Sequence, residues 1–249
     1  MSGHSKWATI KHQKGVADAR RGQLFTKLTR EIIVAVKQSG GDAETNFRLR
    51  LAIQKAREAN MPMDNIQRAI KRGSGETDGA ALVEMVLEGY GPGGAAILVQ
   101  ALSDNRNRTV QEVRNLFTRS GGNMGESGCV AWLFEQKGLI SIDAGDKDPE
   151  ELAMQAIDAG AEDVKIEGTS IEIYTKTNDY MQVRETLTQA GLEIESSEVT
   201  MIPKTTIDLD EKQAHQNLKL LNKLEELDDV QTVSSNINFT EDILNSYEE

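Results

Sequence analysis

The sequence is poor in the residues that build metal centres and disulfide frameworks. It contains one cysteine, Cys129, and three histidines among 249 residues. A single cysteine forms no intramolecular disulfide and leaves no thiol cluster for zinc, which fits a reducing compartment. No apolar run approaches the ~20 residues that cross a bilayer, and the polar, basic N-terminus lacks the apolar segment of a signal peptide. We therefore expect a cytoplasmic protein without a metal site.

Motifs for catalysis are also missing. The sequence has no Walker A motif, no H-E-x-x-H and no nucleophile elbow. Residues 89–94 match the G-x-G-x-x-G expression, but β-type residues follow them where a dinucleotide site needs a helix. They predict a tight glycine hairpin, or else a rigid tip that presents Tyr90 to a partner. Cys129 opens an apolar stretch, as a buried structural thiol does. We expect no enzymatic activity and no cofactor.

The strongest signal that is present is a division of charge along the chain. Residues 1–75 hold fifteen Lys/Arg and six Asp/Glu, a net charge of +9, so the remainder must carry −21 to give the whole-chain charge of −12. A basic segment on an acidic chain indicates binding to a polyanion. The basic end is therefore predicted to contact nucleic acid, and the acidic body is not.

The cations of this basic segment are the candidate nucleic-acid contacts. Any single charged residue is most often part of a solvated face, so the prediction depends on the cluster as a whole. Its aromatic and histidine residues add stacking groups, a composition common in RNA-binding segments. The predicted contacts are Lys6, Trp7, Lys11, His12, Lys14, Arg20, Arg21, Lys27, Arg30, Arg48, Arg50 and Arg57.

Helical periodicity follows the basic arm. Three helices are predicted, over residues 23–38, 46–60 and 64–73. Apolar residues recur every fourth position from Leu24 to Val36, and Gly40 ends that helix. Pro62 ends the second helix, and Asp64 is the expected N-cap of the third. The first 75 residues are thus predicted to be a basic arm with a helical nucleic-acid-binding domain.

Beyond this region the pattern becomes that of an α/β protein. Helices are predicted over residues 109–120, 150–158, 181–190 and 211–227, and strands over 82–88, 95–102, 130–134, 139–142, 164–167, 171–175, 193–201 and 230–236. The middle of this series has the order βαββαβ, the split βαβ of ferredoxin-like folds. The last helix and strand have no partner in that unit, so they are assigned to the first α/β unit. The predicted fold is α+β, with two ferredoxin-like α/β domains: a discontinuous one over 76–137 and 204–249, and an inserted one over 138–203.

A second contact surface is predicted where Arg106 and Arg108 precede the helix expected to begin at Thr109, with a capping box between Thr109 and Glu112. Cations in a first helical turn oppose the helix dipole, at about 0.3–1 kcal/mol each. With free backbone N–H groups they would suit a phosphate. The alternative is that Asp104 and nearby acidic groups simply neutralise both arginines. Tyr90, Arg106 and Arg108 make up this predicted surface.

Several long motifs occur in order along essentially the whole chain. They are Gly3-His4-Ser5-Lys6-Trp7-Ala8, Phe25-Thr26-Lys27, the segment from Gly89 to Gly94, that from Ser103 to Thr109, Gly121-Gly122-Asn123, and that from Phe134 to Gly138. In these motifs the chain resembles the YebC/PmpR family. The resemblance implies one helical and two α/β domains, with no enzyme activity and no cofactor. Bacterial members are usually labelled probable DNA-binding transcriptional regulators, and some are implicated in ribosome function at proline-rich stretches, while the mitochondrial member is a translational activator for a cytochrome oxidase subunit.

Two functions therefore stay open, both of them non-enzymatic. One is a DNA-binding regulator of transcription; the other is a ribosome-associated RNA-binding factor that acts on elongation at proline-rich stretches. The helical domain has no evident helix-turn-helix pair, which weighs against base readout in DNA. A basic arm on an acidic body suits a structured RNA. No membrane or small-molecule partner is expected.

Overall fold

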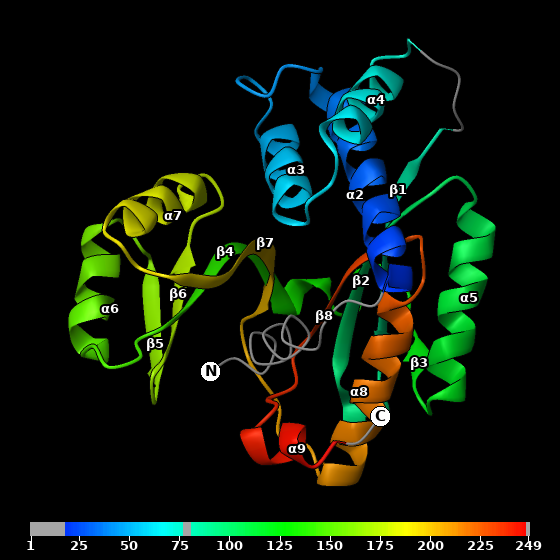
Figure 1. Ribbon diagram of the computed structural model, residues 1–249. Coiled ribbons are helices and arrows are strands. Elements are labelled where there is room, and N and C mark those ends of the chain that lie inside the picture. The colour runs from blue at the N-terminus through cyan, green and yellow to red at the C-terminus, as the bar shows by residue number, and fades with distance from the viewer. Residues whose placement is uncertain (1–17, 77–80, 248–249) are drawn as a thin grey trace.

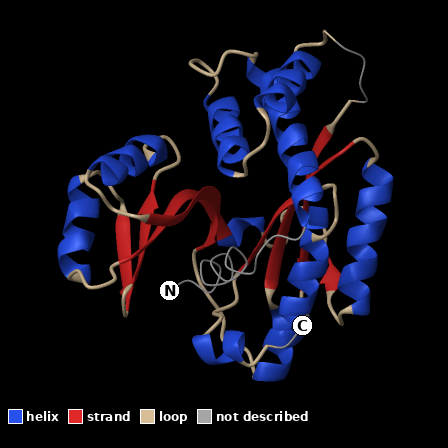
Figure 2. Cartoon of the chain, viewed as in Figure 1, coloured by secondary structure: helices blue, strands red, loops and turns tan. Residues whose placement is uncertain are grey.

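The computed structural model describes residues 18–76 and 81–247. Figure 1 shows a helical region from the early part of the chain and two separate sheets, each accompanied by helices. Figure 2 shows in the same view an all-helical part beside two sheets that carry helices, and because both sheets are antiparallel the fold is α+β. No helix in the described ranges has the length and apolar character that crossing a membrane requires.

The helical region consists of α2 (Asp18–Ser39), α3 (Phe47–Glu58) and α4 (Met63–Gly73). Its core joins all three helices through side chains such as Ile32, Leu49 and Ile66, each at most 1% exposed. The predicted apolar stripe of the first helix is confirmed from Leu28 onward, whereas Leu24 is exposed. The helix also begins earlier than predicted, at Asp18.

The start of α4 differs from the prediction in a way that local chemistry explains. Asp64 is not the N-cap, because Pro62 occupies that position and its carbonyl accepts the N–H of Asn65 at 2.9 Å. Proline suits this place because it has no N–H of its own to satisfy. Asp64 lies in the first turn instead, where a carboxylate interacts favourably with the helix dipole.

The first sheet has the strand order β3-β1-β2-β8, and all neighbouring strands are antiparallel. Its strands are β1 (Val83–Tyr90), β2 (Ala96–Ser103), β3 (Asn123–Met124) and β8 (Val230–Ser235). The helices α5 (Arg106–Arg119) and α8 (Glu211–Glu225) share one core with it, through residues such as Phe117 and Leu221. The predicted return of the last helix and strand to this unit is confirmed. The glycine hairpin is confirmed too, since the Gly91 N–H donates to Ala95 O at 2.8 Å between β1 and β2.

The second sheet is antiparallel with the order β5-β6-β4-β7. Its elements are β4 (Phe134–Asp143), α6 (Pro149–Asp158), β5 (Asp163–Glu167), β6 (Ser170–Thr175), α7 (Tyr180–Gln189) and β7 (Ile194–Pro203). This order along the chain and across the sheet is the predicted ferredoxin-like one. The unit leaves the first sheet after β3 and returns at α8. Whether residues 138–203 fold as an independent domain stays a prediction.

The predicted elements are least accurate at the boundary between the two sheets. The strand predicted over residues 130–134 is wrong: Ala131–Leu133 form a 3-10 turn (η2), and β4 begins at Phe134 rather than near Gly138. The Glu88 carboxylate accepts the N–H groups of Gly128, Val130 and Ala131 at 2.6–2.8 Å. Backbone donors used by a side chain are not available to a strand partner. A short last helix, α9 (Glu241–Asn245), was also not predicted.

Candidate nucleic-acid interface

The predicted contacts of the basic arm fall mostly outside the described residues. Five of them lie outside the described residues: Lys6, Trp7, Lys11, His12 and Lys14. Arg20 lies in α2, but the structure does not describe its side chain. Arg21 is the first predicted contact whose side chain is described. It is exposed, and its guanidinium carbon lies 5.6 Å from the centre of the Phe25 ring.

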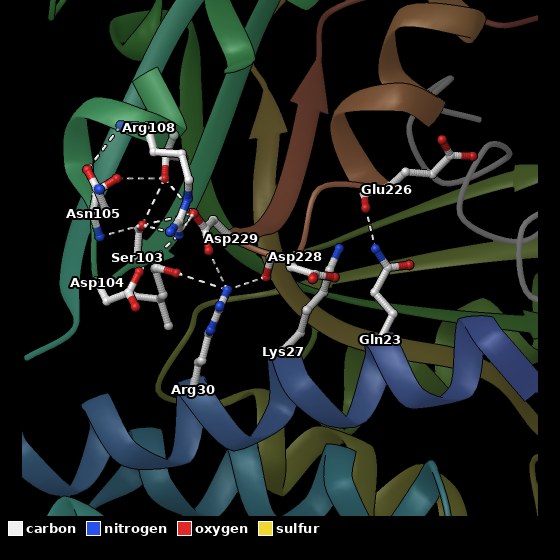
Figure 3. A network of polar contacts seen from close by, with 12 residues as sticks. Gln23, Lys27, Arg30, Ser103, Asp104, Asn105, Arg108, Glu226, Asp228 and Asp229 are labelled. Atoms are coloured by element: carbon white, nitrogen blue, oxygen red, sulfur yellow. Dashed lines mark hydrogen bonds and ion pairs between the residues drawn. The ribbon is translucent and has the colours of Figure 1, made fainter. Parts of the chain in front are cut away.

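The next cations along α2 turn toward the acidic body (Figure 3). Arg30 Nη1 lies 2.6 Å from Asp229 Oδ1 and donates to the Asp228 carbonyl at 2.6 Å. Lys27 and Gln23 donate to the carbonyls of Glu225 and Glu226, at the C-terminal end of α8. Cations interact favourably with that end of a helix, where carbonyls carry partial negative charge. These contacts attach α2 to the body.

Arg48 of α3 forms a similar attachment. Its guanidinium reaches Glu31 of α2 at 2.7 Å and Glu84 of β1 at 2.9 Å. Hydrogen bonds from Arg48 lower the pKa of Glu84, against the opposing effect of burial. We call Lys27, Arg30 and Arg48 the inward cations. All three were predicted to bind nucleic acid, and in the structure each of them contacts acidic or carbonyl groups of the chain itself.

Asp229 is the centre of the polar network in Figure 3. Its side chain is 5% exposed and accepts from Ser103, Thr109 and Arg108 at 2.6–2.8 Å, in addition to the Arg30 ion pair. Burial raises the pKa of Asp229, but the hydrogen bonds and the Arg30 charge outweigh it and lower the value to about 2. One carboxylate thus joins α2, β2, α5 and the loop before β8.

This network corrects the prediction for the start of α5. The helix begins at Arg106 with Asn105 as N-cap, whose side chain accepts the Arg108 N–H, so the capping box at Thr109 is wrong. The Thr109 hydroxyl is buried and donates to Asp229 instead. The Arg108 guanidinium lies 2.9 Å from Asp104 and 2.8 Å from Asp229. It therefore matches the neutralised alternative, while Arg106 is exposed.

The rest of α3 faces the second sheet. Glu58 pairs with Arg184 of α7 at 2.6 Å, and Lys55 lies 3.8 Å from Glu198 of β7. Leu51 packs against the core of the second unit. Of the two remaining predicted contacts, Arg57 is exposed and Arg50 is half-buried, with its guanidinium carbon 5.9 Å from the Phe47 ring centre. Little of the α3 surface is therefore free to enter a groove of a nucleic acid.

A different helix presents the open basic surface. Arg68, Lys71 and Arg72 of α4 are exposed, and within the described residues none of the three forms an ion pair. Among the described residues, Arg68 bonds within its own helix, to Asp64 O at 3.2 Å and to the Asn65 side chain. We call these three residues the outward cations. They belong to the predicted basic cluster but were not among its selected contacts, although Ile66, Ala69 and Gly73 mark the opposite, buried face at helical spacing.

Metal-ligating side chains and Cys129 are the other candidates for chemistry in the described ranges. No group of three or more His, Cys, Asp or Glu side chains there is placed to hold a metal ion. Burial and the neighbouring Glu88 raise the pKa of the Cys129 thiol, which opposes the thiolate form that a nucleophile needs.

The helical region and the two antiparallel sheets together define a three-part α+β class of protein. The model of the TACO1/YebC protein N-terminal domain matches residues 5–76, and that of the TACO1/YebC second and third domain matches residues 82–237. The chain belongs to the TACO1/YebC family.

Similar proteins match this chain over nearly its full length. A protein of Dehalococcoides mccartyi, named as a probable transcriptional regulatory protein, is 60% identical over 99% of this chain and 98% of its own. One of Trichlorobacter lovleyi with the same name is 53% identical over 97% of this chain and 98% of its own. The crystal structure of a conserved hypothetical protein from Aquifex aeolicus, 50% identical, matches with a TM-score of 0.84 over 96% of this chain and 99% of that chain.

Proposed function

We propose that this protein is a non-enzymatic regulator of gene expression that binds nucleic acid through its N-terminal basic region. The observation that carries the proposal is the division of the cations between α2 and α3 on one side and α4 on the other. The inward cations hold the helical region on the acidic body, whereas the outward cations of α4 are exposed and form no ion pair within the described residues. Exposed clustered cations bind phosphates and release condensed counterions.

Relatives named as transcriptional regulatory proteins support DNA as the target. Duplex DNA would bind through its phosphates along α4 and the basic arm. Phosphate contacts of this kind position a protein without reading sequence. The regulator would then depend on the arm, or on DNA shape, for its choice of site.

RNA within the ribosome is the second candidate target, and one observation favours it. A helix-turn-helix protein places an exposed recognition helix in the major groove. Here α3 packs between α2 and the second sheet, and two of the three outward cations of α4 lie in its last turn. Backbone contacts without an exposed reading helix suit a folded RNA, which is recognised by shape.

Binding measured against salt tests the proposal and separates the two targets. Fluorescence anisotropy with a labelled DNA duplex and with a ribosomal RNA fragment should show affinities that fall steeply with salt. The variant Arg68→Gln/Lys71→Gln/Arg72→Gln should bind more weakly to the true target at unchanged melting temperature. Co-sedimentation with ribosomes, abolished by RNase, would identify RNA. Equal binding by the variant and the parent chain would contradict the proposal.

A further inference from the structure

Two aromatic side chains are exposed in the described part of the chain, and they lie together. Trp132 is 65% exposed and Tyr90 is 39% exposed, while the other described aromatic residues are buried or half-buried. Tryptophan is usually well buried because its large ring gains much from leaving water. An exposed aromatic pair in a chain with only 4% aromatic residues therefore needs a reason.

Both rings are oriented by one backbone oxygen. The Tyr90 hydroxyl donates to the Cys129 carbonyl at 3.0 Å, and the Trp132 indole N–H donates to the same carbonyl at 3.1 Å. The two polar ends thus meet at one atom, and each ring keeps an exposed part. With their hydrogen bonds satisfied inside the protein, the rings offer mainly π-surface to a partner.

The support beneath this pair is rigid. Glu88 is 4% exposed, and its carboxylate accepts the N–H groups of Gly128, Val130 and Ala131 from the loop that follows β3. Burial raises the pKa of Glu88, but these three backbone hydrogen bonds outweigh it, so the net pKa is lowered and the carboxylate stays charged. The loop that carries Cys129 and Trp132 is therefore fixed to β1, the strand that ends at Tyr90. Preorganisation of this kind reduces the entropy lost on binding.

The charges around the pair favour a base over a phosphate. Lys204 is exposed and its ammonium donates to the Trp132 carbonyl at 3.0 Å. Glu126 in the loop and Glu135 at the start of β4 are exposed as well. Lys137 lies 3.9 Å from Glu135, so two cations and two carboxylates balance around the pair. The pair therefore offers no net attraction for phosphate, and a neutral planar base needs none.

We propose that Tyr90 and Trp132 form a platform on which an unpaired base of single-stranded RNA stacks. Stacking accepts any base, since every base has a π-face. Bases in duplex DNA are already paired and stacked, whereas RNA loops and ends present unpaired bases to aromatic side chains. The platform rests on the proposed function in that the basic region would deliver the nucleic acid, and it assigns to the acidic body a contact of its own.

Tryptophan fluorescence tests the platform directly. The chain has two tryptophans, so in a Trp7→Phe background Trp132 is the single emitter. A short oligouridylate should quench and shift its emission, because a stacked base withdraws the ring from water. A DNA duplex of matching length should leave the emission unchanged. Binding of the oligouridylate without any change in Trp132 emission would overturn the proposal.

Affinity gives the second readout. Trp132→Ala should weaken oligouridylate binding by about 5- to 150-fold, the range that stacking of one base supplies, and Trp132→Phe should recover most of the loss. The parent-to-variant ratio should be the same at low and high salt, since stacking neutralises no phosphate. Met154→Ala on α6 is the matched control, because Met154 is 69% exposed and lies on the second unit.

The outcomes separate this inference from the proposed function. If the parent chain binds neither RNA nor DNA, the proposed function fails and the platform fails with it. If the parent chain binds RNA with a steep salt dependence and Trp132→Ala binds equally well, the platform alone is wrong. If Trp132→Ala loses binding to a protein partner but not to RNA, the aromatic pair is a protein contact and the proposal is overturned.

Discussion

The inward and outward cations of the helical region have the same chemistry and opposite environments. Arg30 of α2 is 20% exposed and shares the buried Asp229 carboxylate with Arg108. Arg72 of α4 is exposed in the last turn of its helix. Both residues belong to the same basic segment of the sequence. The difference lies in which helix packs against the acidic body: α2 does, whereas the buried face of α4 packs on α2 and α3. One basic segment therefore contains cations that attach a domain and cations that stay exposed.

This comparison changes what the charge asymmetry means. An acidic body of net charge −21 is itself a polyanion, and part of the basic segment has docked on it. Net charge describes long-range attraction and association rates, and it does not identify contacts. The cations left over after internal pairing are the better guide to a nucleic-acid surface.

The largest expected effect comes from removing the outward cations. Arg68→Gln/Lys71→Gln/Arg72→Gln should weaken nucleic-acid binding strongly at low salt, because three phosphate contacts are lost. Stability should stay within about 0.5 kcal/mol, as is usual for exposed positions. Anisotropy titration and urea unfolding measure the two quantities. A destabilised variant with normal affinity would reverse the roles of the two cation sets.

The next effect concerns the centre of the inward network. Asp229→Asn should lower the free energy of unfolding by about 3 kcal/mol, because buried donors and Arg30 lose a charged partner. Asp228→Asn is the matched control, since Arg30 bonds to the Asp228 carbonyl and the Asp228 side chain is exposed. Equal urea midpoints for the two variants would show that Asp229 contributes no more than a surface residue.

Acid should act through the same group. The pKa of Asp229 is lowered from its ordinary 3.8 to about 2 in the folded protein, so protons bind the unfolded chain more readily. Its contribution to stability is present above about pH 4 and is lost as the pH falls through the folded pKa. Urea midpoints between these pH values should fall less for Asp229→Asn than for the parent chain. Parallel pH profiles would contradict this assignment.

A smaller effect is expected at Arg48. Arg48→Gln removes a partly exposed pair of ion contacts and should cost about 1 kcal/mol of stability. Because the guanidinium is already held by Glu31 and Glu84, nucleic-acid affinity should change less than about twofold. A loss of affinity comparable to that of the outward variant would mean that Arg48 leaves its carboxylates to bind phosphate.

The smallest effect distinguishes the two arginines at the start of α5. Arg106→Gln should leave stability unchanged or raise it by a few tenths of a kcal/mol, since a first-turn cation opposes the dipole. Arg108→Gln should lower the melting temperature, because Asp229 and Asp104 lose a partner. Thermal unfolding of both single variants checks the contrast. Equal melting temperatures would show that the contacts of Arg108 with Asp104 and Asp229 do not stabilise the protein.

The local pattern of this sequence predicts the elements well and their long-range partners poorly. The helix and strand periods predicted the ferredoxin-like order of the second unit correctly. They also left α8 and β8 without partners in that unit, which correctly assigned both to the first sheet. The Asp229 network was out of reach, because Thr109 and Asp229 are 120 residues apart and no local period links them. The turn before β4 was missed for the same reason, since the Glu88 carboxylate that shapes it comes from β1.

The candidate contacts show the same difference between local pattern and long-range packing. The sequence identified the basic segment, but the inward cations cannot be recognised without knowing what their helix packs against. For α4 the spacing of Ile66, Ala69 and Gly73 was sufficient to assign the buried face, and with it the exposed one. For α2 the docking site is formed by Glu225, Glu226 and Asp229, far away in the chain.

The salt dependence of binding, measured for both cation sets on one labelled DNA duplex or RNA, tests the central claim most directly. Well below its melting temperature, the inward variant Lys27→Gln/Arg30→Gln/Arg48→Gln should keep the parent slope of log affinity against log salt. The outward variant should have a slope shallower by about 2.7 on duplex DNA, or about 2.1 on a single strand, because three phosphates are no longer neutralised by the protein. A shallower slope for the inward variant, with the outward variant unchanged, would contradict the account.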